Sequence, residues 1–224
     1  MRIAVLTANL GKFDNIFGMP KQQGIKFDFF YYNEHNLPFP LPNLNNRLKS
    51  KYLKIQTHRF LPDYDAYIWI DSSIEILANI FVVNFLSYLE ADQLSVDSYD
   101  VAIYKHCERN NVYEEINYIL DSISIGNKYL TSRYGDQLIH RELMLYKNNK
   151  LPDEYPLFNT YMFARLNNVK VNNAFDEWWR RCIEFSNFDQ AMFSLIAYQH
   201  KLNIKQLVID PIRTTKLFKR QQHL

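Results

Sequence analysis

The chain has 224 residues, of which 47 % are hydrophobic and 16 % aromatic, so it is long enough to bury a substantial core. Its formal net charge is +2 and 22 % of its residues are charged, a composition that excludes disordered and fibrous proteins and predicts no nucleic-acid partner. Two cysteines cannot make a disulfide framework, and no apolar run approaches the roughly 20 residues of a membrane span. We therefore predict a soluble, cytoplasmic protein with no transmembrane segment.

Four basic residues lie close together near the C-terminus. They are Arg213, Lys216, Lys219 and Arg220. They are typical of a solvated tail, and the alternative is a peripheral contact with an anionic surface, such as a membrane, or with an anionic substrate.

Apolar runs alternate with helical patterns along the chain. Strands are predicted over 3–7, 26–33, 66–70, 100–106, 157–165 and 206–211. Helices are predicted over 43–60, 79–91, 112–123, 174–185 and 187–201. This alternation indicates an α/β domain with a mostly parallel sheet, in which ligands bind beyond the carboxyl ends of the strands.

Asp71 follows the buried strand AYIWI directly. If the chain stays extended, Asp71, Ser73 and Glu75 point to the same side, and oxygen ligands at that spacing suit Mg²⁺ or Mn²⁺ carrying a diphosphate. The alternative is that Ser72-x-x-Glu75 is a capping box that begins a helix. The local sequence leaves both interpretations open.

The first strand ends in LTANLGKFD, where Thr7, Asn9 and Gly11 follow at once. The segment is neither GxGxxG nor a P-loop, so it predicts no dinucleotide or Walker-type site. A ligand-binding loop and an ordinary polar turn are both consistent with it.

A basic stripe follows helical spacing in the segment 43–60. Its members are Arg47, Lys51, Lys54 and His58. Such a stripe can hold phosphate oxygens, and it can equally be a solvated helix face.

Two further pairs of candidates lie at the ends of predicted elements. His106 and Arg109 come after the strand 100–106, where a ligand could reach them. Asp189 and Gln190 open an apolar helix, where an acid is favoured by the helix dipole or can act as a general base.

The order of these segments carries a resemblance. TANLGKFD, RLKSKYLKIQTHRFLPDYDAYIWIDSSIEI, YKHCERNNVYEE, LFNTYMFAR and FDEWWRRCIEFSNFDQAMF follow one another along nearly the whole chain. This series resembles small nucleotide-sugar glycosyltransferase domains of GT-A type, above all the group found in plant Golgi proteins, bacteria and large DNA viruses. The resemblance implies one Rossmann-like α/β domain over 1–224, with a nucleotide-binding part at about 1–106, an acceptor and catalytic part at about 107–210, and a basic tail at 211–224.

The resemblance also implies roles for individual residues. The nucleotide would be bound by Thr7, Ala8, Asn9, Asp14, Lys51, Lys54 and Asp71. The sugar and the acceptor would be bound by His106, Arg109, Asn159 and Gln190. Asp189 would be the catalytic base. Asp71 and Ser73 match the D-x-D element, so they would hold Mn²⁺ or Mg²⁺, with His200 or His223 as a further ligand.

Two positions depart from the family pattern. Ser73 replaces the second Asp of D-x-D, and Tyr161 stands where the F-N-x-G segment has Gly. The resemblance thus predicts metal-assisted, inverting transfer of a hexose or deoxyhexose from a UDP- or GDP-sugar to a glycan or glycoconjugate. A retaining transferase is the rival within this class. The alternative outside it is a non-catalytic sugar- or nucleotide-binding module, with Trp69, Trp178 and Trp179 as aromatic residues that could stack on sugars.

Overall fold

The computed structural model describes residues 1–224 except 13, 16–17, 42, 91–97, 208–215 and 222–224. Its strands are β1 (Ile3–Ala8), β2 (Asp28–Tyr32), β3 (Ala66–Ile70), β4 (Ile74–Ile76), β5 (Val101–Lys105), β6 (Phe158–Leu166), β7 (Ile204–Leu207) and β8 (Phe218–Arg220). Its helices are α1 (Asn46–Ile55), α2 (Thr57–Phe60), α3 (Phe81–Ser87), α4 (Val112–Ser124), α5 (Lys128–Tyr134), α6 (Ile139–Asn148), α7 (Val169–Glu184) and α8 (Asp189–Gln199).

Six strands form the central sheet in the order β2-β1-β3-β6-β5-β7. The pairs β1/β2, β1/β3 and β5/β7 are parallel, and β6 runs antiparallel to both of its neighbours. The predicted α/β class and the mostly parallel sheet are confirmed. Because β6 is reversed, its first residues lie at the same edge as the carboxyl ends of β1, β3 and β5.

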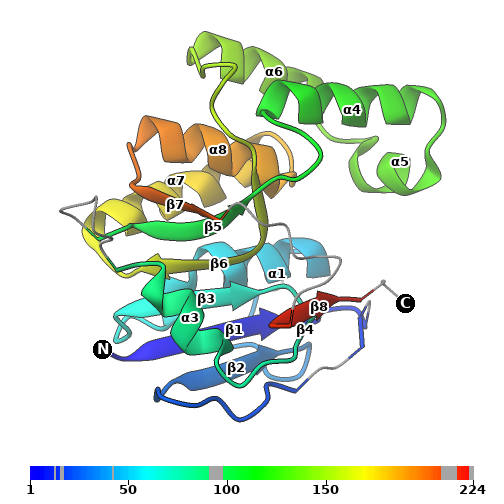
Figure 1. Cartoon of the computed structure of the whole chain (residues 1–224). Coiled ribbons are helices and arrows are strands. Elements are labelled where there is room, and N and C mark those ends of the chain that lie inside the picture. The colour runs from blue at the N-terminus through cyan, green and yellow to red at the C-terminus, as the bar shows by residue number, and fades with distance from the viewer. Residues whose placement is uncertain (13, 16–17, 42, 91–97, 208–215, 222–224) are drawn as a thin grey trace.

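Helices cover both faces of this sheet (Figure 1). Along β1, Ala4 and Leu6 belong to the core on the side of α1, α7 and α8, while Ile3 and Val5 pack in the core that includes α3, β4 and β8. All four side chains are buried, which explains why this strand reads as a continuous apolar run.

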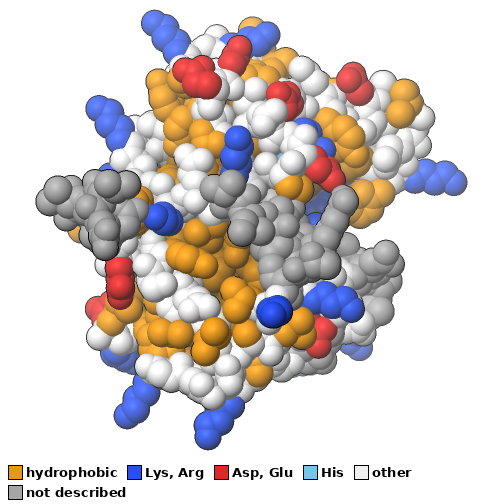
Figure 2. Space-filling view, in the orientation of Figure 1, with side chains coloured by type: hydrophobic (Ala, Val, Ile, Leu, Met, Phe, Trp, Pro, Cys, Tyr) orange, Lys and Arg blue, Asp and Glu red, His pale blue; other side chains and the backbone are white. Residues whose placement is uncertain are grey.

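Helices α4, α5 and α6 form a group that we call the overhang, because it projects beyond the sheet edge (Figure 1). Figure 2 shows the same projecting lobe, with a recess below it. Asn111 begins α4 by accepting a hydrogen bond from the Glu114 amide at 2.9 Å, and Gly126, with φ of +82°, follows its last turn. Helices α5 and α6 were not predicted.

Several predicted boundaries change in the structure. The helix predicted for 43–60 divides at Gln56 into α1 and α2. The capping box at Ser72–Glu75 begins no helix, because the chain turns after Asp71 and enters β4. Residues 208–211 of the last predicted strand lie outside the described residues.

The described part of the predicted basic tail contains a strand, and its basic side chains Lys216, Lys219 and Arg220 are exposed, as the solvated interpretation requires. Strand β8 pairs with β4 in an antiparallel ribbon in which Lys219 lies opposite Glu75. Phe218 is fully buried, and its ring lies edge-on to Phe81. Arg213 lies outside the described residues.

Candidate active site

Four predicted site residues lie along one edge of the sheet. Asn9 follows β1, Asp71 follows β3, Asn159 is the second residue of β6, and His106 follows β5. Since these strands are neighbours in the order β1-β3-β6-β5, the topology brings together segments that are as far as 150 residues apart in sequence. This edge is therefore the candidate active site.

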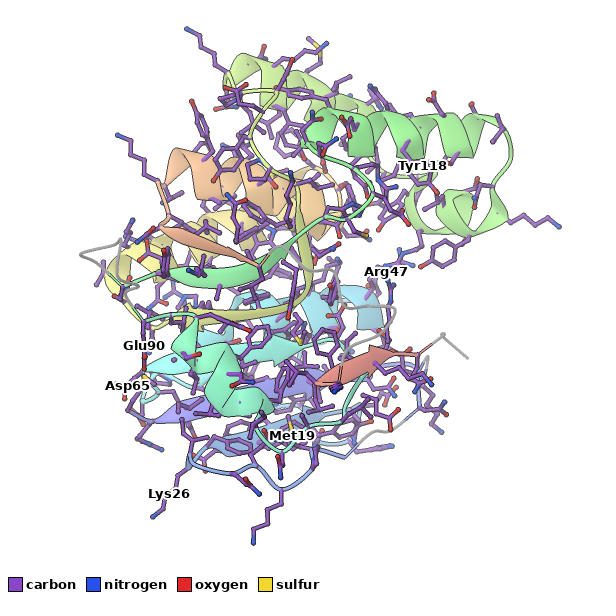
Figure 3. The ribbon with its side chains drawn as sticks, viewed as in Figure 1. Met19, Lys26, Arg47, Asp65, Glu90 and Tyr118 are labelled. Carbon is purple, nitrogen blue, oxygen red and sulfur yellow. The ribbon has the colours of Figure 1, made fainter. Side chains whose placement is uncertain are left out.

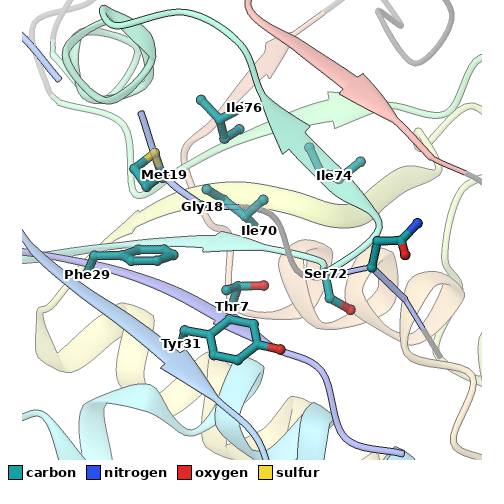
Figure 4. Close-up of a pocket in the computed structure, with 10 residues that line it drawn as sticks. Thr7, Gly18, Met19, Phe29, Tyr31, Ile70, Ser72, Ile74 and Ile76 are labelled. Carbon is teal, nitrogen blue, oxygen red and sulfur yellow. The ribbon is translucent and has the colours of Figure 1, made fainter. Parts of the chain in front are cut away.

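A pocket opens at the β1 and β2 end of this edge (Figure 4). Its wall includes Thr7, Tyr31 and Ser72, with apolar side chains of Met19 and Ile74 beside them. A partly apolar lining with a few polar groups is typical of small-molecule sites.

The loop after β1 is tied to the turn after β3. Ser72 Oγ donates a hydrogen bond to Asp14 Oδ2, and Asn9 Nδ2 donates to the Asp14 carbonyl at 2.7 Å. Ala8 and Asn9 are buried. The structure thus places the predicted nucleotide residues Thr7, Ala8, Asn9 and Asp14 next to the segment that carries Asp71.

Two buried amide atoms at this edge lack hydrogen-bond partners among the described residues. They are Oδ1 of Asn9 and Nδ2 of Asn159, whose side chains belong to residues 5 % and 4 % exposed. Leaving such a group unsatisfied costs about 1–3 kcal/mol, so native proteins rarely keep one without a role. A polar ligand that enters at this edge would satisfy both an acceptor and a donor.

Asp71 has one oxygen engaged and one available. Its Oδ1 accepts a hydrogen bond from Trp69 Nε1 at 2.6 Å and lies 3.8 Å from Lys54 Nζ. No described residue bonds Oδ2, and the side chain is 39 % exposed. Asp71 can therefore present a carboxylate oxygen to a ligand.

The predicted extended run through Asp71, Ser73 and Glu75 is wrong. The Ile74 amide donates to the Asp71 carbonyl at 2.9 Å, which closes a turn. The turn is held on its other side because the Gln221 amide donates to the Ser73 carbonyl at 2.7 Å and Gln221 Nε2 donates to Glu75 Oε2 at 2.6 Å. Glu75 thus pairs with the C-terminal segment.

Asp189 lies in a buried ion cluster with two lysines of α1. Lys51 Nζ bonds its Oδ1, and Lys54 Nζ bonds its Oδ2 at 2.7 Å. Burial alone would raise the pKa of Asp189, but the charges and hydrogen bonds of Lys51 and Lys54 hold it well below its ordinary value. In this arrangement the carboxylate is a weak base, and accepting a proton requires that a lysine first moves away.

A bulge in β6 completes the cluster. The pairing of β5 with β6 jumps from Ile103↔Phe163 to Tyr104↔Asn159, so residues 160–162 have no partner on β5. Within the bulge, Thr160 Oγ1 donates to Asp189 Oδ2 at 3.2 Å, and the Tyr161 carbonyl accepts from the Asp71 amide at 2.8 Å. The bulge therefore connects the two aspartates.

The overhang supports the cluster through Glu142. This side chain is fully buried and accepts hydrogen bonds from Ser186 Oγ and from Tyr146 Oη. Burial raises the pKa of Glu142 to about 7, against the opposing effect of these bonds. Ser186 Oγ also accepts from the Phe188 amide at 3.1 Å, so Glu142 holds the segment that leads into Asp189.

Two of the predicted sugar and acceptor residues, Arg109 and Gln190, bond the buried Glu115. Its carboxylate accepts from Arg109 Nε and, at 3.3 Å, from Gln190 Nε2. His106 Nδ1 accepts from the Arg109 amide at 3.0 Å, and the Arg109 guanidinium lies 4.3 Å from the ring centroid of Tyr118. The structure thus joins Arg109 and Gln190 through a buried carboxylate, and His106 is linked to them through Arg109.

His58, the last member of the basic stripe, faces a different cluster. Burial and the charge of Arg165 lower its pKa to about 4, and Asp176 opposes them. Its Nε2 bonds Asp176 Oδ1 at 2.9 Å, and its Nδ1 accepts from Arg165 Nη2 at 3.2 Å. The stripe therefore contributes Lys51 and Lys54 to the Asp189 cluster and not His58.

The described residues provide few ligands for a cation. No group of three or more His, Cys, Asp and Glu side chains suited to a metal occurs among them. His200 follows the far end of α8, about 16 Å along the helix from Asp189, so it is not the further ligand at this edge. His223 lies outside the described residues. Asp71 Oδ2 fits as a single protein ligand, the arrangement in which Mg²⁺ takes further ligands from substrate phosphates and water.

Sequence reasoning missed three residues of the site. Thr160 and Glu142 carried no local signal, whereas Glu115 stood in the segment VYEE and was given no role. Trp69 and Trp178 are buried, and Trp179 packs against the core.

The described helices include none that is both long enough and apolar enough to cross a membrane.

Known proteins share this chain's sequence pattern and fold. The family model described as TOD1/MUCI70, glycosyltransferase-like domain, matches residues 35–223. No curated protein matches the sequence.

Three similar solved structures are glycosyltransferases. One is involved in the glycosylation of the major capsid of PBCV-1: identity 11 %, 97 % of this chain and 93 % of that chain covered, TM-score 0.46. Mouse Xyloside xylosyltransferase 1 is 12 % identical, with 94 % of this chain and 86 % of that chain covered and a TM-score of 0.46. The bifunctional glycosyltransferase WbbM is 12 % identical, with 94 % of this chain and 39 % of that chain covered and a TM-score of 0.51. At such identities a likeness concerns the fold alone, and of these three only WbbM exceeds a TM-score of 0.5.

Proposed function

Because the chain belongs to the TOD1/MUCI70 glycosyltransferase-like domain family, we propose that it transfers a sugar from a nucleotide-diphosphate sugar to a hydroxyl of a glycan or glycoconjugate. The observation that best supports this proposal is the pair of unsatisfied amide atoms of Asn9 and Asn159 beside the available oxygen of Asp71. These groups lie at one sheet edge and would bind a polar ligand with both donors and acceptors.

In the proposed binding mode the nucleoside occupies the pocket beside Thr7, and the diphosphate lies next to Asp71 and Lys54. Asn159 would donate to a sugar hydroxyl. We also propose that Mn²⁺ or Mg²⁺ binds together with the diphosphate. Asp71 Oδ2 would be the cation's protein ligand, and a bound cation would offset charge on the departing diphosphate. Ser73, the predicted second ligand, is buried within the turn after Asp71, so the proposal does not rest on it.

In the proposed chemistry the acceptor oxygen forms a bond to the anomeric carbon as the bond from that carbon to the diphosphate oxygen breaks. The acceptor proton passes to Asp189, and the nucleoside diphosphate leaves. For Asp189 to accept the proton, Lys51 or Lys54 must release it, and a bound diphosphate offers each lysine an alternative anion. This single displacement would invert the anomeric configuration.

The first experiment is a thermal-shift panel of UDP- and GDP-sugars with and without Mn²⁺. A donor held at 100 times its Kd should add about 2.7 kcal/mol to the free energy of unfolding. A flat panel would count against the whole transferase proposal.

A second experiment separates a transferase from a binding module. Slow hydrolysis of a stabilising donor, measured by release of the nucleoside diphosphate, requires catalysis. Asp189→Asn should retain donor binding and lose transfer, because general-base catalysis contributes about 10²–10⁴-fold. Normal turnover by this variant would remove Asp189 as the base. An NMR assignment of the product anomer would distinguish inversion from retention.

A further inference from the structure

Two arginines meet where α1 begins below the overhang. Arg47 Nη1 donates to the Arg133 carbonyl at 2.9 Å, which joins the first turn of α1 to the last turn of α5. Among the described residues, no carboxylate lies within ion-pairing distance of either guanidinium. Neither guanidinium therefore forms an ion pair with a described residue, although the charge of Asp189 acts on Arg133 from a greater distance.

The surroundings of Arg133 restrict its guanidinium without neutralising it. Its Nη1 donates to the Tyr129 hydroxyl, and its Cζ lies 5.3 Å from the Tyr129 ring centroid and 5.6 Å from that of Tyr134. Its Nε is buried and has no partner among the described residues. A guanidinium that is oriented by a hydrogen bond and by two aromatic rings, and that has no carboxylate partner among the described residues, is suited to bind an anion.

Helix α1 fixes where these arginines lie relative to the donor side. Lys54 reaches both Asp71 and Asp189, Lys51 one turn earlier reaches Asp189 only, and Arg47 lies a further turn toward the start of the helix. Four residues advance a helix by about 6 Å, so Arg47 is on the side of Asp189 that faces away from Asp71. In Figure 3, Arg47 lies below the overhang that carries Tyr118.

We propose that Arg47 and Arg133 bind an anionic group of the acceptor, so that the preferred acceptor is an acidic saccharide bearing a carboxylate or a phosphate. This inference rests on the proposed function, because the acceptor side is defined by a donor at Asp71. Arginine suits this task because its planar fork binds carboxylate and phosphate oxygens in pairs.

The test compares acidic and neutral sugars of the same size. Calorimetric Kd values are measured for methyl glucuronide, glucose 6-phosphate and methyl glucoside, each with UDP present at saturation. We expect at least one acidic sugar to bind at least tenfold more tightly than methyl glucoside, and the arm that does so distinguishes a carboxylate from a phosphate. Equal affinity for all three sugars would overturn the proposal.

Variants locate the preference. Arg133→Gln and Arg47→Gln should each weaken the acidic sugar at least tenfold and change the affinity for methyl glucoside less than twofold. Arg133→Lys keeps the charge and loses the fork, so it should fall between Arg133→Gln and the unmodified protein. The matched control is Arg141→Gln, an exposed arginine of α6. An undiminished preference in both glutamine variants would overturn the assignment.

Two controls distinguish acceptor binding from donor binding and from a loss of folding. If Arg133→Gln weakens UDP as much as the acidic sugar, the arginines serve the donor and the inference is wrong. If a variant does not fold, raising NaCl from 50 to 500 mM in the unmodified protein should weaken the acidic sugar selectively, and an unchanged preference would overturn the proposal. Stabilisation of the unmodified protein by UDP- and GDP-sugars is measured separately, so a flat donor panel defeats the transferase proposal whatever the acidic-sugar result.

Discussion

The sheet edge around Asp71 and the cluster around Asp189 treat their polar groups in opposite ways. At the first, an oxygen of Asp71 and an amide atom in each of Asn9 and Asn159 have no partner among the described residues. At the second, both oxygens of Asp189 are bonded by lysines and the residue is 8 % exposed. One region has unused bonding capacity for a ligand, and the other uses its capacity to hold charged side chains in place.

Burial of a charge and readiness for a ligand are therefore separate properties of a site. A buried ion pair gains little net stability, but breaking it leaves an uncompensated charge. The following predictions test whether the two regions are as distinct as the structure indicates.

The largest effect is expected for Asp189→Asn. The change leaves the buried Lys51 with no counter-ion and Lys54 with only Asp71 at 3.8 Å, so the free energy of unfolding should fall by about 3–5 kcal/mol in urea titrations. Because the folded pKa of Asp189 is below its ordinary value of 3.8, its contribution is complete above about pH 5 and declines as the pH falls. The control is Asp121→Asn on the exposed face of α4, which should change stability by less than about 0.5 kcal/mol. If Asp189→Asn and the unmodified protein were equally stable, the cluster around Asp189 would not stabilise the fold.

Glu142→Gln tests the support of the cluster from the overhang. The folded pKa of Glu142 is about 7 against an ordinary value of 4.5, so its protonated form favours folding below pH 4.5 and this advantage is lost as the pH rises through 7. Relative to the unmodified protein, Glu142→Gln should therefore gain stability between pH 5 and pH 8, by at most about 3 kcal/mol. Parallel pH profiles for the two proteins would contradict an ionisable Glu142 at this position.

Asp71→Asn tests the ligand-binding side. It should lower kcat/KM for transfer at least 100-fold, which corresponds to about 2.7 kcal/mol of transition-state stabilisation. Stability should change little, because the side chain is 39 % exposed and one of its oxygens is unbonded. Asp63→Asn, at an exposed position before β3, is the matched control. An Asp71→Asn enzyme with normal kcat/KM would exclude this aspartate from donor binding.

The strand ends were predictable because each is a local property. Asp71 and His106 directly follow apolar runs, and the rule for parallel sheets places such residues at one edge. The reversal of β6, which brings Asn159 to that edge, was not visible in the sequence, because an apolar strand reads the same in either direction. The partners of Asp189 were also hidden, since Lys51 and Asp189 are 138 residues apart and no local pattern links them.

The smallest effect is expected for Asn111→Ala, which tests whether the overhang can be loosened without disturbing the sheet edge. The Asn111 side chain caps α4 by accepting from the Glu114 amide, and its loss should cost about 1 kcal/mol. Amide exchange should quicken in the first turn of α4, which carries Glu115, while the amides of β1 and β3 keep their protection. Asn117→Ala, at an exposed position on the same helix, should change neither. If exchange instead quickens equally in β1, the overhang and the sheet unfold as one cooperative unit. The contrast between the two regions would then describe their bonding and not their stability.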